Sequence, residues 1–253
     1  MLAAERRRII IQRIQATGQV VVSALSSEFA VSDETIRRDL EHLEKEGIAV
    51  RIYGGAVVAG NDRVAPPYSI RKNTNVEPKV AIARLLADML SDGDTLMVDE
   101  SSTAAYAVRA IRHLKNITLI TNSVELLREM PVQDSWHIVS TGGSLKPDLL
   151  ALVGPHAART VQSYHVRYAI LSCRGINEKL GLADSSDDVV QVKQAMMASA
   201  DCTILLADHR KFDREGLVAL GGLSAVDKLI TDAPLSAQWQ KQLEKAGVEV
   251  VCD

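Results

Sequence analysis

Several polar residues of this chain have the chemistry of an anion-binding site. Ser101, Ser102 and Thr103 are consecutive hydroxyl residues at the predicted start of a helix. Free backbone N–H groups and the helix dipole favour an anion at such a position, and hydroxyl groups add hydrogen-bond donors. Arg174 and Lys211 could supply the positive charge that a phosphate group requires. These residues predict a phosphate site, although the hydroxyl residues could instead be helix caps and the cations ordinary surface residues.

Other polar residues could contact the uncharged part of a ligand. Asp99 and Asn122 could bind sugar hydroxyl groups, or they could brace their own loops. Gly142 and Gly143 could allow a ligand to approach the backbone closely, or they could form a simple turn. The sequence leaves both alternatives open for each pair.

The sequence gives little support for a metal or a cofactor. Asp187 and Asp188 fall in the first turn of a predicted helix, where carboxylates complement the helix dipole. Cys173, Cys202 and Cys252 are far apart in the sequence and lack the close spacing of a zinc site. We therefore expect no metal, no cofactor and no disulfide.

A second group of residues, near the N-terminus, could contact nucleic acid. Ile36, Leu40 and Leu43 are spaced as one apolar stripe of a helix, so Arg37 and Arg38 must face another direction. The net charge of −3, and the eight basic and eight acidic residues among the first sixty, give no overall signal for nucleic acid. The prediction therefore depends on how the charges are distributed along this helix.

The first sixty residues have the element spacing of a helix-turn-helix followed by a wing. We expect helices at 5–16, 23–29 and 32–46, with Ser23 and Ser32 as N-caps. A turn of about three residues before a longer helix with a polar start is typical of this motif. The other predicted elements are a single β-bridge at 20–22, helix ends at Gly18 and Gly47, and a hairpin of strands 48–52 and 56–58 around 53–55.

The rest of the chain alternates helices with short apolar strands. Strands that are apolar throughout and separated by helices indicate a mostly parallel sheet covered on both faces, an open α/β fold. Ligands bind at the carboxyl ends of such strands, and the candidate residues above follow them. We expect strands at 95–98, 117–120, 137–140, 168–172, 203–206, 229–230 and 248–251, and helices at 79–90, 104–114, 124–130, 155–161, 187–200 and 235–246.

Nearly the whole chain resembles the DeoR family of bacterial sugar-catabolism regulators. In the N-terminal part the resemblance rests on the run Val31-Ser32-x-x-Thr35-Ile36-Arg37-Arg38-Asp39-Leu40-x-x-Leu43-Glu44-x-x-Gly47 and on Arg51-x-Tyr53-Gly54-Gly55-Ala56. In the C-terminal part it rests on Lys79-x-x-Ile82-Ala83, Gly93-Asp94, Asp99-x-Ser101-Ser102-Thr103, Thr121-Asn122-Ser123, Gly142-Gly143, Gly154, Lys193-x-x-Met196 and Asp208-x-x-Lys211-Phe212.

The resemblance implies a fold, a domain organisation and two sets of binding residues. We expect a winged helix-turn-helix domain at 1–58, a linker at 59–78 and, at 79–253, an α/β effector-sensing domain similar in fold to sugar-phosphate isomerases. The family usually has Gly where this chain has Ser101, so the site could be narrower here. The implied DNA-binding residues are Ser32, Thr35, Arg37, Arg38, Arg51 and Tyr53, and the implied effector-binding residues are Asp99, Ser101, Ser102, Thr103, Asn122, Gly142, Gly143, Arg174 and Lys211.

The function expected from these features is that of a transcriptional regulator. We expect a repressor of a carbohydrate catabolic operon that binds double-stranded operator DNA as a homo-oligomer, a dimer or tetramer, and responds to a sugar phosphate. A charged N-terminus and the lack of a long apolar stretch predict a cytoplasmic protein without membrane segments.

Two alternatives remain open at the level of the sequence. The first is a sugar-phosphate isomerase or transferase with an appended DNA-binding domain, in which Glu100 would be the base. The second is a DNA-binding protein whose α/β part serves only oligomerisation. We expect no catalytic residue, and the response of the protein to sugar phosphates would separate the alternatives.

Overall fold

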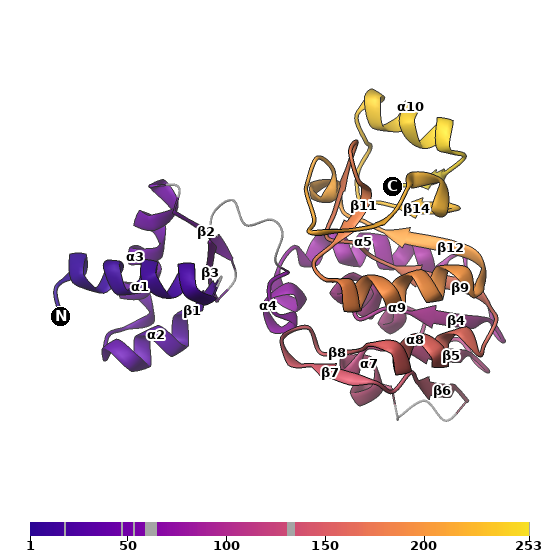
Figure 1. The fold of residues 1–253 in the computed structure, drawn as a ribbon, viewed down its shortest axis with the longest axis horizontal. Helices are drawn as coiled ribbons and strands as arrows, with labels where there is room; N and C mark the ends of the chain where they lie inside the picture. The colour runs from indigo at the N-terminus through magenta and orange to yellow at the C-terminus, as the bar shows by residue number, and fades with distance from the viewer. Residues whose placement is uncertain (18, 47, 53, 59–64, 131–134, 253) are drawn as a thin grey trace. The chain divides into compact units, whose positions relative to one another are not determined.

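A computed structural model describes residues 1–17, 19–46, 48–52, 54–58, 65–130 and 135–252 of the chain. These residues form two compact units, Met1–Thr74 and Asn75–Asp253 (Figure 1). Each unit is described by itself below.

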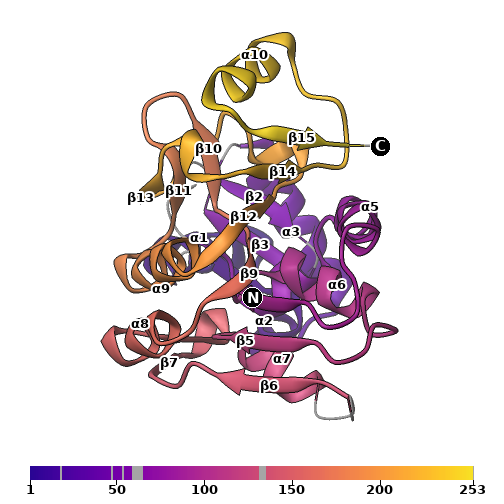
Figure 2. The same cartoon turned by 90° about the vertical axis from the view of Figure 1, so that its right-hand side faces the viewer.

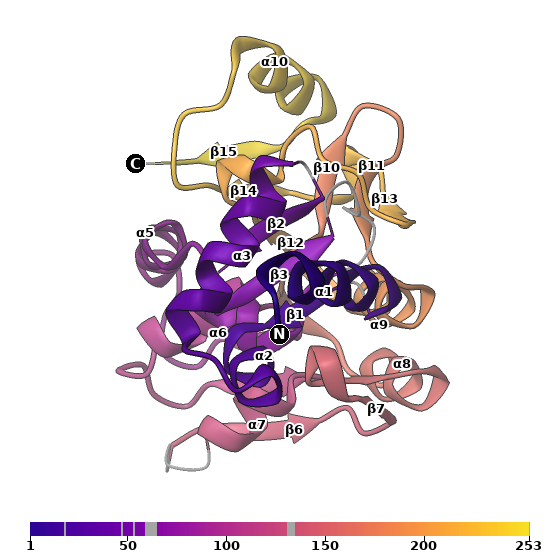
Figure 3. The same ribbon diagram turned by 90° about the vertical axis from the view of Figure 1, so that its left-hand side faces the viewer.

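Within the N-terminal unit, the described residues up to Val58 form three helices and a small antiparallel sheet (Figure 3). Ile36, Leu40 and Leu43 are fully buried against Ile10 and Ile14, as the apolar periodicity predicts. The sheet has the strand order β1-β3-β2, so the segment predicted to form a single bridge is a paired strand. The elements are α1 (Ala3–Thr17), β1 (Gln19–Val21), α2 (Val22–Phe29), α3 (Asp33–Lys45), β2 (Ala49–Ile52) and β3 (Gly55–Val58).

The ends of these helices test the predicted caps. Ser32 caps α3, because its hydroxyl oxygen accepts a hydrogen bond from the backbone N–H of Thr35 at 3.2 Å. The prediction for Ser23 was wrong: α2 begins at Val22, and the backbone carbonyl of Ser23 instead accepts hydrogen bonds from the hydroxyl groups of Ser26 and Ser27. Gly18 and Gly47 lie outside the described residues.

Part of the segment that we expected to be a linker is helical. Helix α4 (Tyr68–Asn73) lies within 59–78, and α5 (Val76–Ala87) begins three residues before the predicted start at Lys79. Residues 59–64 lie outside the described part of the chain. The division between the two units falls between Thr74 and Asn75.

The C-terminal unit contains a seven-stranded sheet with the order β15-β14-β12-β9-β4-β5-β6 (Figure 2). All its neighbouring strands are parallel, as the uniformly apolar strand sequences predict. The strands are β4 (Thr95–Val98), β5 (Thr118–Thr121), β6 (His137–Ser140), β9 (Val166–Leu171), β12 (Ala200–Leu206), β14 (Lys228–Ile230) and β15 (Glu249–Val251).

Helices cover both faces of this sheet (Figure 2). On β4, Leu96 and Val98 pack with α5, α6 (Ser102–Ala110) and α7 (Val124–Glu129), whereas Met97 packs with α8 (Pro155–Gln162) and α9 (Asp187–Ala198). Successive side chains of a strand point to opposite faces, so this alternation is the expected result of burial on both sides. No helix in the described part of the chain is long and apolar enough to cross a membrane.

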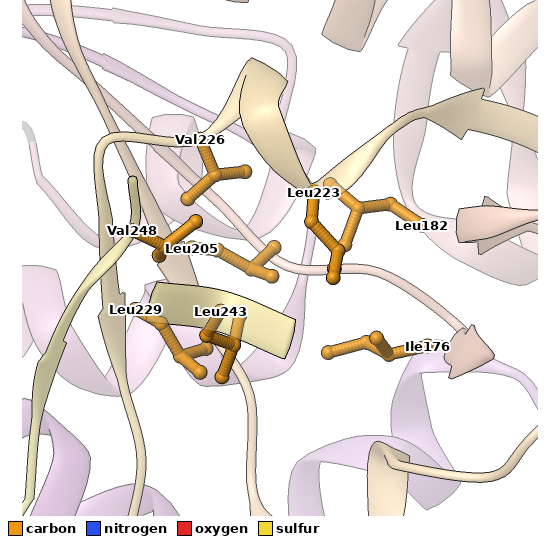
Figure 4. Close-up of a pocket in the computed structure, with 8 residues that line it drawn as sticks. All are labelled: Ile176, Leu182, Leu205, Leu223, Val226, Leu229, Leu243 and Val248. Atoms are coloured by element: carbon orange, nitrogen blue, oxygen red, sulfur yellow. The ribbon is translucent and has the colours of Figure 1, made fainter. Parts of the chain in front are cut away.

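Besides the two apolar layers on the faces of the sheet, the C-terminal unit has another apolar cluster, which includes side chains of helix α10 (Ala237–Ala246). It encloses a cavity of about 10 Å³ that is lined by eight aliphatic side chains (Figure 4). A space this small and apolar offers a ligand neither room nor hydrogen-bond partners. We therefore assign the cavity to core packing.

Short antiparallel strands, which the sequence analysis did not identify, extend the unit beyond the parallel sheet. One pair forms a hairpin, and three more strands form a separate sheet with the order β10-β11-β13. Their bounds are β7 (Ser144–Lys146), β8 (Ala151–Val153), β10 (Gly175–Asn177), β11 (Gly181–Asp184) and β13 (Val218–Gly221).

Candidate DNA interface and effector site

The exposed face of α3 carries the predicted DNA-binding arginines. The side chains of Arg37 and Arg38 are 54% and 78% exposed, and both point away from the buried stripe. Glu34 lies 3.6 Å from each guanidinium group. Exposed ion pairs of this length contribute little stability, so both arginines can exchange Glu34 for another anion at small cost.

Three of the other predicted DNA-binding residues lie at the start of α3 or on β2. Ser32 is exposed, and its hydroxyl group lies 2.9 Å from that of Thr35, so both hydroxyl groups belong to the cap of α3. Arg51 is exposed on β2, and its backbone N–H donates a hydrogen bond to the carboxylate of Glu44. Tyr53 lies outside the described residues.

The predicted effector residues follow five strands that are adjacent in the sheet, β12, β9, β4, β5 and β6. The carboxyl ends of parallel strands meet at one edge, so these residues are brought to the same side of the unit. Asp99 and the three hydroxyl residues follow β4, Asn122 follows β5, Gly142 and Gly143 follow β6, Arg174 follows β9 and Lys211 follows β12.

The three hydroxyl residues form the N-terminus of α6, and all three are buried. The hydroxyl oxygen of Ser101 accepts a hydrogen bond from the backbone N–H of Ala104 at 3.1 Å. The carboxylate of Asp99 accepts a hydrogen bond from the backbone N–H of Ser101 at 2.9 Å. Ser101 is therefore a helix cap, and Asp99 already places negative charge near the start of this helix.

Asn122 joins two of the strand-end loops. Its side-chain amide donates hydrogen bonds to the carboxylate of Glu100 at 3.1 Å and to the carbonyl of Leu152 at 3.2 Å. These two acceptors fix the orientation of the amide group. The side-chain oxygen of Asn122 is buried and has no hydrogen-bond partner in the structure. Such an acceptor is a place where a ligand hydroxyl group could donate.

A buried lysine, Lys193 of α9, connects several of these loops. Its ammonium nitrogen lies 3.0 Å from Asp99, 3.4 Å from Glu100 and 2.7 Å from Asp184, and it donates a hydrogen bond to the carbonyl of Ser172 at 2.8 Å. All four charged side chains are at most 8% exposed. The cluster therefore holds the ends of β4, β9 and β11 together.

The charges of this cluster shift one another's pKa values. Burial alone would lower the pKa of Lys193, but the three carboxylates raise that pKa well above its ordinary value. Burial alone would raise the pKa of Asp184, but the charge and hydrogen bond of Lys193 hold it below its usual value. Lys193 and Asp184 are thus both charged at neutral pH.

Lys211 lies at the neighbouring strand end. Its ammonium group donates a hydrogen bond at 2.6 Å to the carbonyl of Cys173, which follows β9. Strand β9 lies between β12 and β4 in the sheet, so this contact is beside the loop that follows β4. Burial lowers the pKa of Lys211, and the charge of Arg174 lowers it further. Burial raises the pKa of the Cys173 thiol to about 12, so this cysteine is an unreactive packing residue at neutral pH.

The two glycines after β6 differ in what they require. A Cβ atom on Gly143 would lie 2.6 Å from the carbonyl oxygen of Val153 and 3.0 Å from the side chain of Ala157, so packing against β8 and α8 explains this glycine. Gly142 has a φ of +61°, and no atom lies within 4 Å of the position that a Cβ would take. For Gly143, the structure therefore supports a packing role.

Comparisons with known proteins show which family has this combination of domains. The DeoR-like helix-turn-helix domain matches residues 6–61, and the DeoR C terminal sensor domain matches residues 74–233. An uncharacterized HTH-type transcriptional regulator of Bacillus subtilis, YulB, is 37% identical over 250 residues, which cover 99% of this chain and 96% of the relative. The chain belongs to the DeoR family of transcriptional regulators.

Two further similarities accompany this assignment. The glycerol-3-phosphate regulon repressor of Escherichia coli is 30% identical to this DeoR-family regulator over 234 residues, 92% of each chain. Ribose 5-phosphate isomerase A of Methanocaldococcus jannaschii is 17% identical, with a TM-score of 0.40 over 55% of each chain. This DeoR-family protein is a DNA-binding regulator of transcription.

Two charge interactions of the DeoR-family chain were not predicted from its residues. Asp39 on α3 is buried, and its carboxylate lies 2.5 Å from the guanidinium nitrogen of Arg6 on α1. Lys193 was recognised from the sequence only as part of a family motif, and its pairing with Asp184 was not predicted. A charged residue at a position whose helical spacing places it on a buried face is the signal that could have identified Asp39.

Proposed function

We propose that this protein represses a carbohydrate catabolic operon and that a phosphorylated sugar controls its binding to the operator. The observation that supports the proposal is that cationic, hydroxyl and amide side chains follow adjacent strands and meet at one edge of the sensor sheet. Relatives named for repression of the glycerol-3-phosphate regulon and of the aga operon support a sugar-derived effector. We place this activity in the cytoplasm, where the operator DNA of a bacterium lies.

In the DNA-binding domain, we propose that α3 enters the major groove. Arg37 and Arg38 then contact bases or phosphates, and Ser32, Thr35 and Arg51 contact the flanking backbone. The exposure of both arginines and their weak pairing with Glu34 support this use of the helix. Tyr53 remains a candidate from the sequence alone.

In the sensor domain, we propose a position and an orientation for the effector. The five loops span four strand spacings, about 19 Å at about 4.8 Å each, which is more than one sugar phosphate can bridge. We place the phosphate group between Lys211 and the start of α6, with Arg174 nearby, and the sugar hydroxyl groups over Asp99 and Asn122. The unpaired oxygen of Asn122 supports this orientation. Gly142 and Gly143 then lie at the margin of the site.

We propose binding rather than catalysis for this site. An isomerase requires a carboxylate base that can reach its substrate. The carboxylate of Glu100 is buried, accepts a hydrogen bond from Asn122 and lies 3.4 Å from Lys193, which supports a role in bracing the loops.

The coupling between effector and DNA requires more than one chain. We propose a homo-oligomer, a dimer or tetramer, because repeated operator half-sites match a symmetric protein. An effector that binds one arrangement of the oligomer more tightly shifts the population towards it and so changes the affinity for the operator.

Two measurements test the proposal. A thermal-shift screen of the full chain against sugar phosphates and their unphosphorylated parents should find a phosphorylated ligand that raises the melting temperature. In a gel-shift titration, that ligand should release the wild-type protein from its operator. A protein that responds to no sugar phosphate, or equally to a free sugar, would contradict the proposed effector.

The DNA-binding part of the proposal has its own test. Arg38→Ala should weaken operator binding by about 1 to 3 kcal/mol if Arg38 contacts a base, without changing the melting temperature. A titration at fixed salt with the operator and with a scrambled duplex separates base contact from phosphate contact. Unchanged binding to both duplexes would remove Arg38 from the interface.

A further inference from the structure

The ion pair between Arg6 and Asp39 differs from the other ion pairs of α3 in the described part of the chain. The side chains of Arg6 and Asp39 are 7% and 5% exposed, and the pair joins α1 to α3. The other pairs of α3 join residues three or four positions apart, within the helix or with its C-cap residue, and their side chains are 45% or more exposed. Asp39 is also the residue next to Arg38, so the buried pair and the proposed DNA contact are on consecutive residues.

Apolar packing sets which face of α3 is buried, but it constrains the exact rotation of the helix less sharply than a directional contact does. Ile36, Leu40 and Leu43 pack against Ile10 and Ile14 of α1, and contacts between such side chains have little directional preference. A charge-assisted hydrogen bond depends on both distance and angle. The Nε–Oδ2 contact of 2.5 Å therefore restricts the rotation of α3 about its own axis relative to α1.

Stability gives little reason to place a charge pair at this position. Replacing a buried ion pair with well-packed apolar side chains of similar size is often neutral or stabilising, because both charges no longer need to leave water. What an apolar pair lacks is the directional constraint. The advantage of the charge pair is thus to be sought in the placement of the residues on the opposite face of α3.

We infer that Arg6 and Asp39 are positioning residues for operator recognition. The pair sets the rotation of α3 so that Arg37 and Arg38 present a single arrangement to the operator, although neither Arg6 nor Asp39 contacts DNA. The inference rests on the proposed use of α3 as the recognition helix. It assigns specificity to a contact on the buried side of the domain.

The test compares an apolar pair with a matched control in the full-length protein. An operator is first selected from a pool of random duplexes with the wild type, and a scrambled duplex of equal composition serves as the reference. The variants are Arg6→Met/Asp39→Leu and, as the control, Arg13→Met/Glu28→Leu, which removes an exposed ion pair between α1 and α2. Each is measured for the melting of the N-terminal domain and for affinity to both duplexes.

The expected result separates specificity from stability. The Arg6→Met/Asp39→Leu variant should keep its melting transition and its affinity for the scrambled duplex, but lose about tenfold or more in affinity for the operator. The control should keep both affinities. An unchanged ratio between operator and scrambled duplex in the apolar variant would overturn the inference.

A second variant covers the case in which the apolar pair does not fold. Arg6→Lys retains the charge but replaces the planar guanidinium group with a rotatable ammonium group. Arg6→Lys should fold and show a lower ratio of operator affinity to scrambled-duplex affinity than the wild type. A ratio equal to that of the wild type would overturn the inference. If the wild type selects no duplex at all, the proposed function fails, and that result is distinct from a failure of the positioning role.

Discussion

At the scale of single residues, the sensor domain depends on buried charges that have many partners. Lys193 contacts three carboxylates and one backbone carbonyl, so its removal takes a common cation from three buried carboxylates. The loss of one partner from a buried ion pair costs far more than the net contribution of the pair.

Lys193→Met should destabilise the sensor domain by at least about 3 to 5 kcal/mol, because Asp99, Glu100 and Asp184 would lose their common cation. The control is Lys228→Met, since Lys228 pairs with the exposed carboxylate of Glu249 and should cost less than about 1 kcal/mol. Denaturant unfolding of both variants measures the difference. Equal losses would show that the cluster contributes no more than a surface pair.

The same cluster predicts a pH range of stability. The pKa of Asp184 is lower in the folded than in the unfolded protein. The contribution of Asp184 to the free energy of unfolding is therefore lost as the pH falls below about 4 and through the folded pKa. The pKa of Lys193 is higher in the folded than in the unfolded protein. The contribution of Lys193 to the free energy of unfolding is therefore complete below about pH 10.4 and is lost as the pH rises through the folded pKa.

Lys211→Ala should weaken binding of the effector by about 1.5 to 3 kcal/mol and leave DNA binding without effector intact. A bound phosphate raises the lowered pKa of Lys211, so the affinity should fall as the pH rises through the pKa of the free protein. Arg210→Ala is the matched control, because Arg210 lies on the same short helix and its side chain bonds to Asn75 instead. Calorimetric titration between pH 7 and 10 should show a pH-dependent affinity in the control and a weaker, flatter profile in Lys211→Ala.

At the scale of elements, the wing depends on a close contact between strands. A Cβ atom on Gly55 would lie 2.0 Å from the backbone carbonyl oxygen of Val20, so β1 and β3 could not pair as they do. Gly54 has a φ of +81° but open space around its Cα. The two neighbouring glycines therefore serve different purposes.

Gly55→Ala should destabilise the N-terminal domain more than Gly54→Ala does. The first substitution forces two backbones apart, whereas the second places alanine in a left-handed conformation at a cost of about 1 to 2 kcal/mol. Circular dichroism of the two variants during thermal unfolding provides the comparison. A smaller loss for Gly55→Ala would mean that β1 separates from β3 without consequence.

The success of the sequence analysis also differed among elements. The seven parallel strands were identified from short apolar runs that alternate with predicted helices, whereas the antiparallel strands β7, β8, β10, β11 and β13, of three or four residues each, do not follow that alternation. The edge of the sheet that holds the candidate site followed from the strands. The contacts of Lys193 could not be predicted in this way, because Asp99 and Asp184 are distant from each other in the sequence and a lysine on a helix is ordinarily exposed.

At the scale of the whole molecule, the two units have separate apolar cores. Ile36→Asp should place a carboxylate among Ile10, Ile14 and Leu40 and unfold the N-terminal domain. The sensor domain should keep its own thermal transition and its response to the effector. Calorimetry that shows both transitions lost together would mean that the two units unfold as one.

The burial of the sensor residues also has a consequence for how such a protein evolves. Of the proposed effector residues, Arg174 and Lys211 are partly exposed, so we expect substitutions there to cost less stability than substitutions of the fully buried charged residues. Asp99, Glu100, Asp184 and Lys193 depend on one another, and any single replacement passes through an unstable intermediate. New ligand preferences are thus expected to arise first at the exposed margin, while the buried quartet is inherited as a unit.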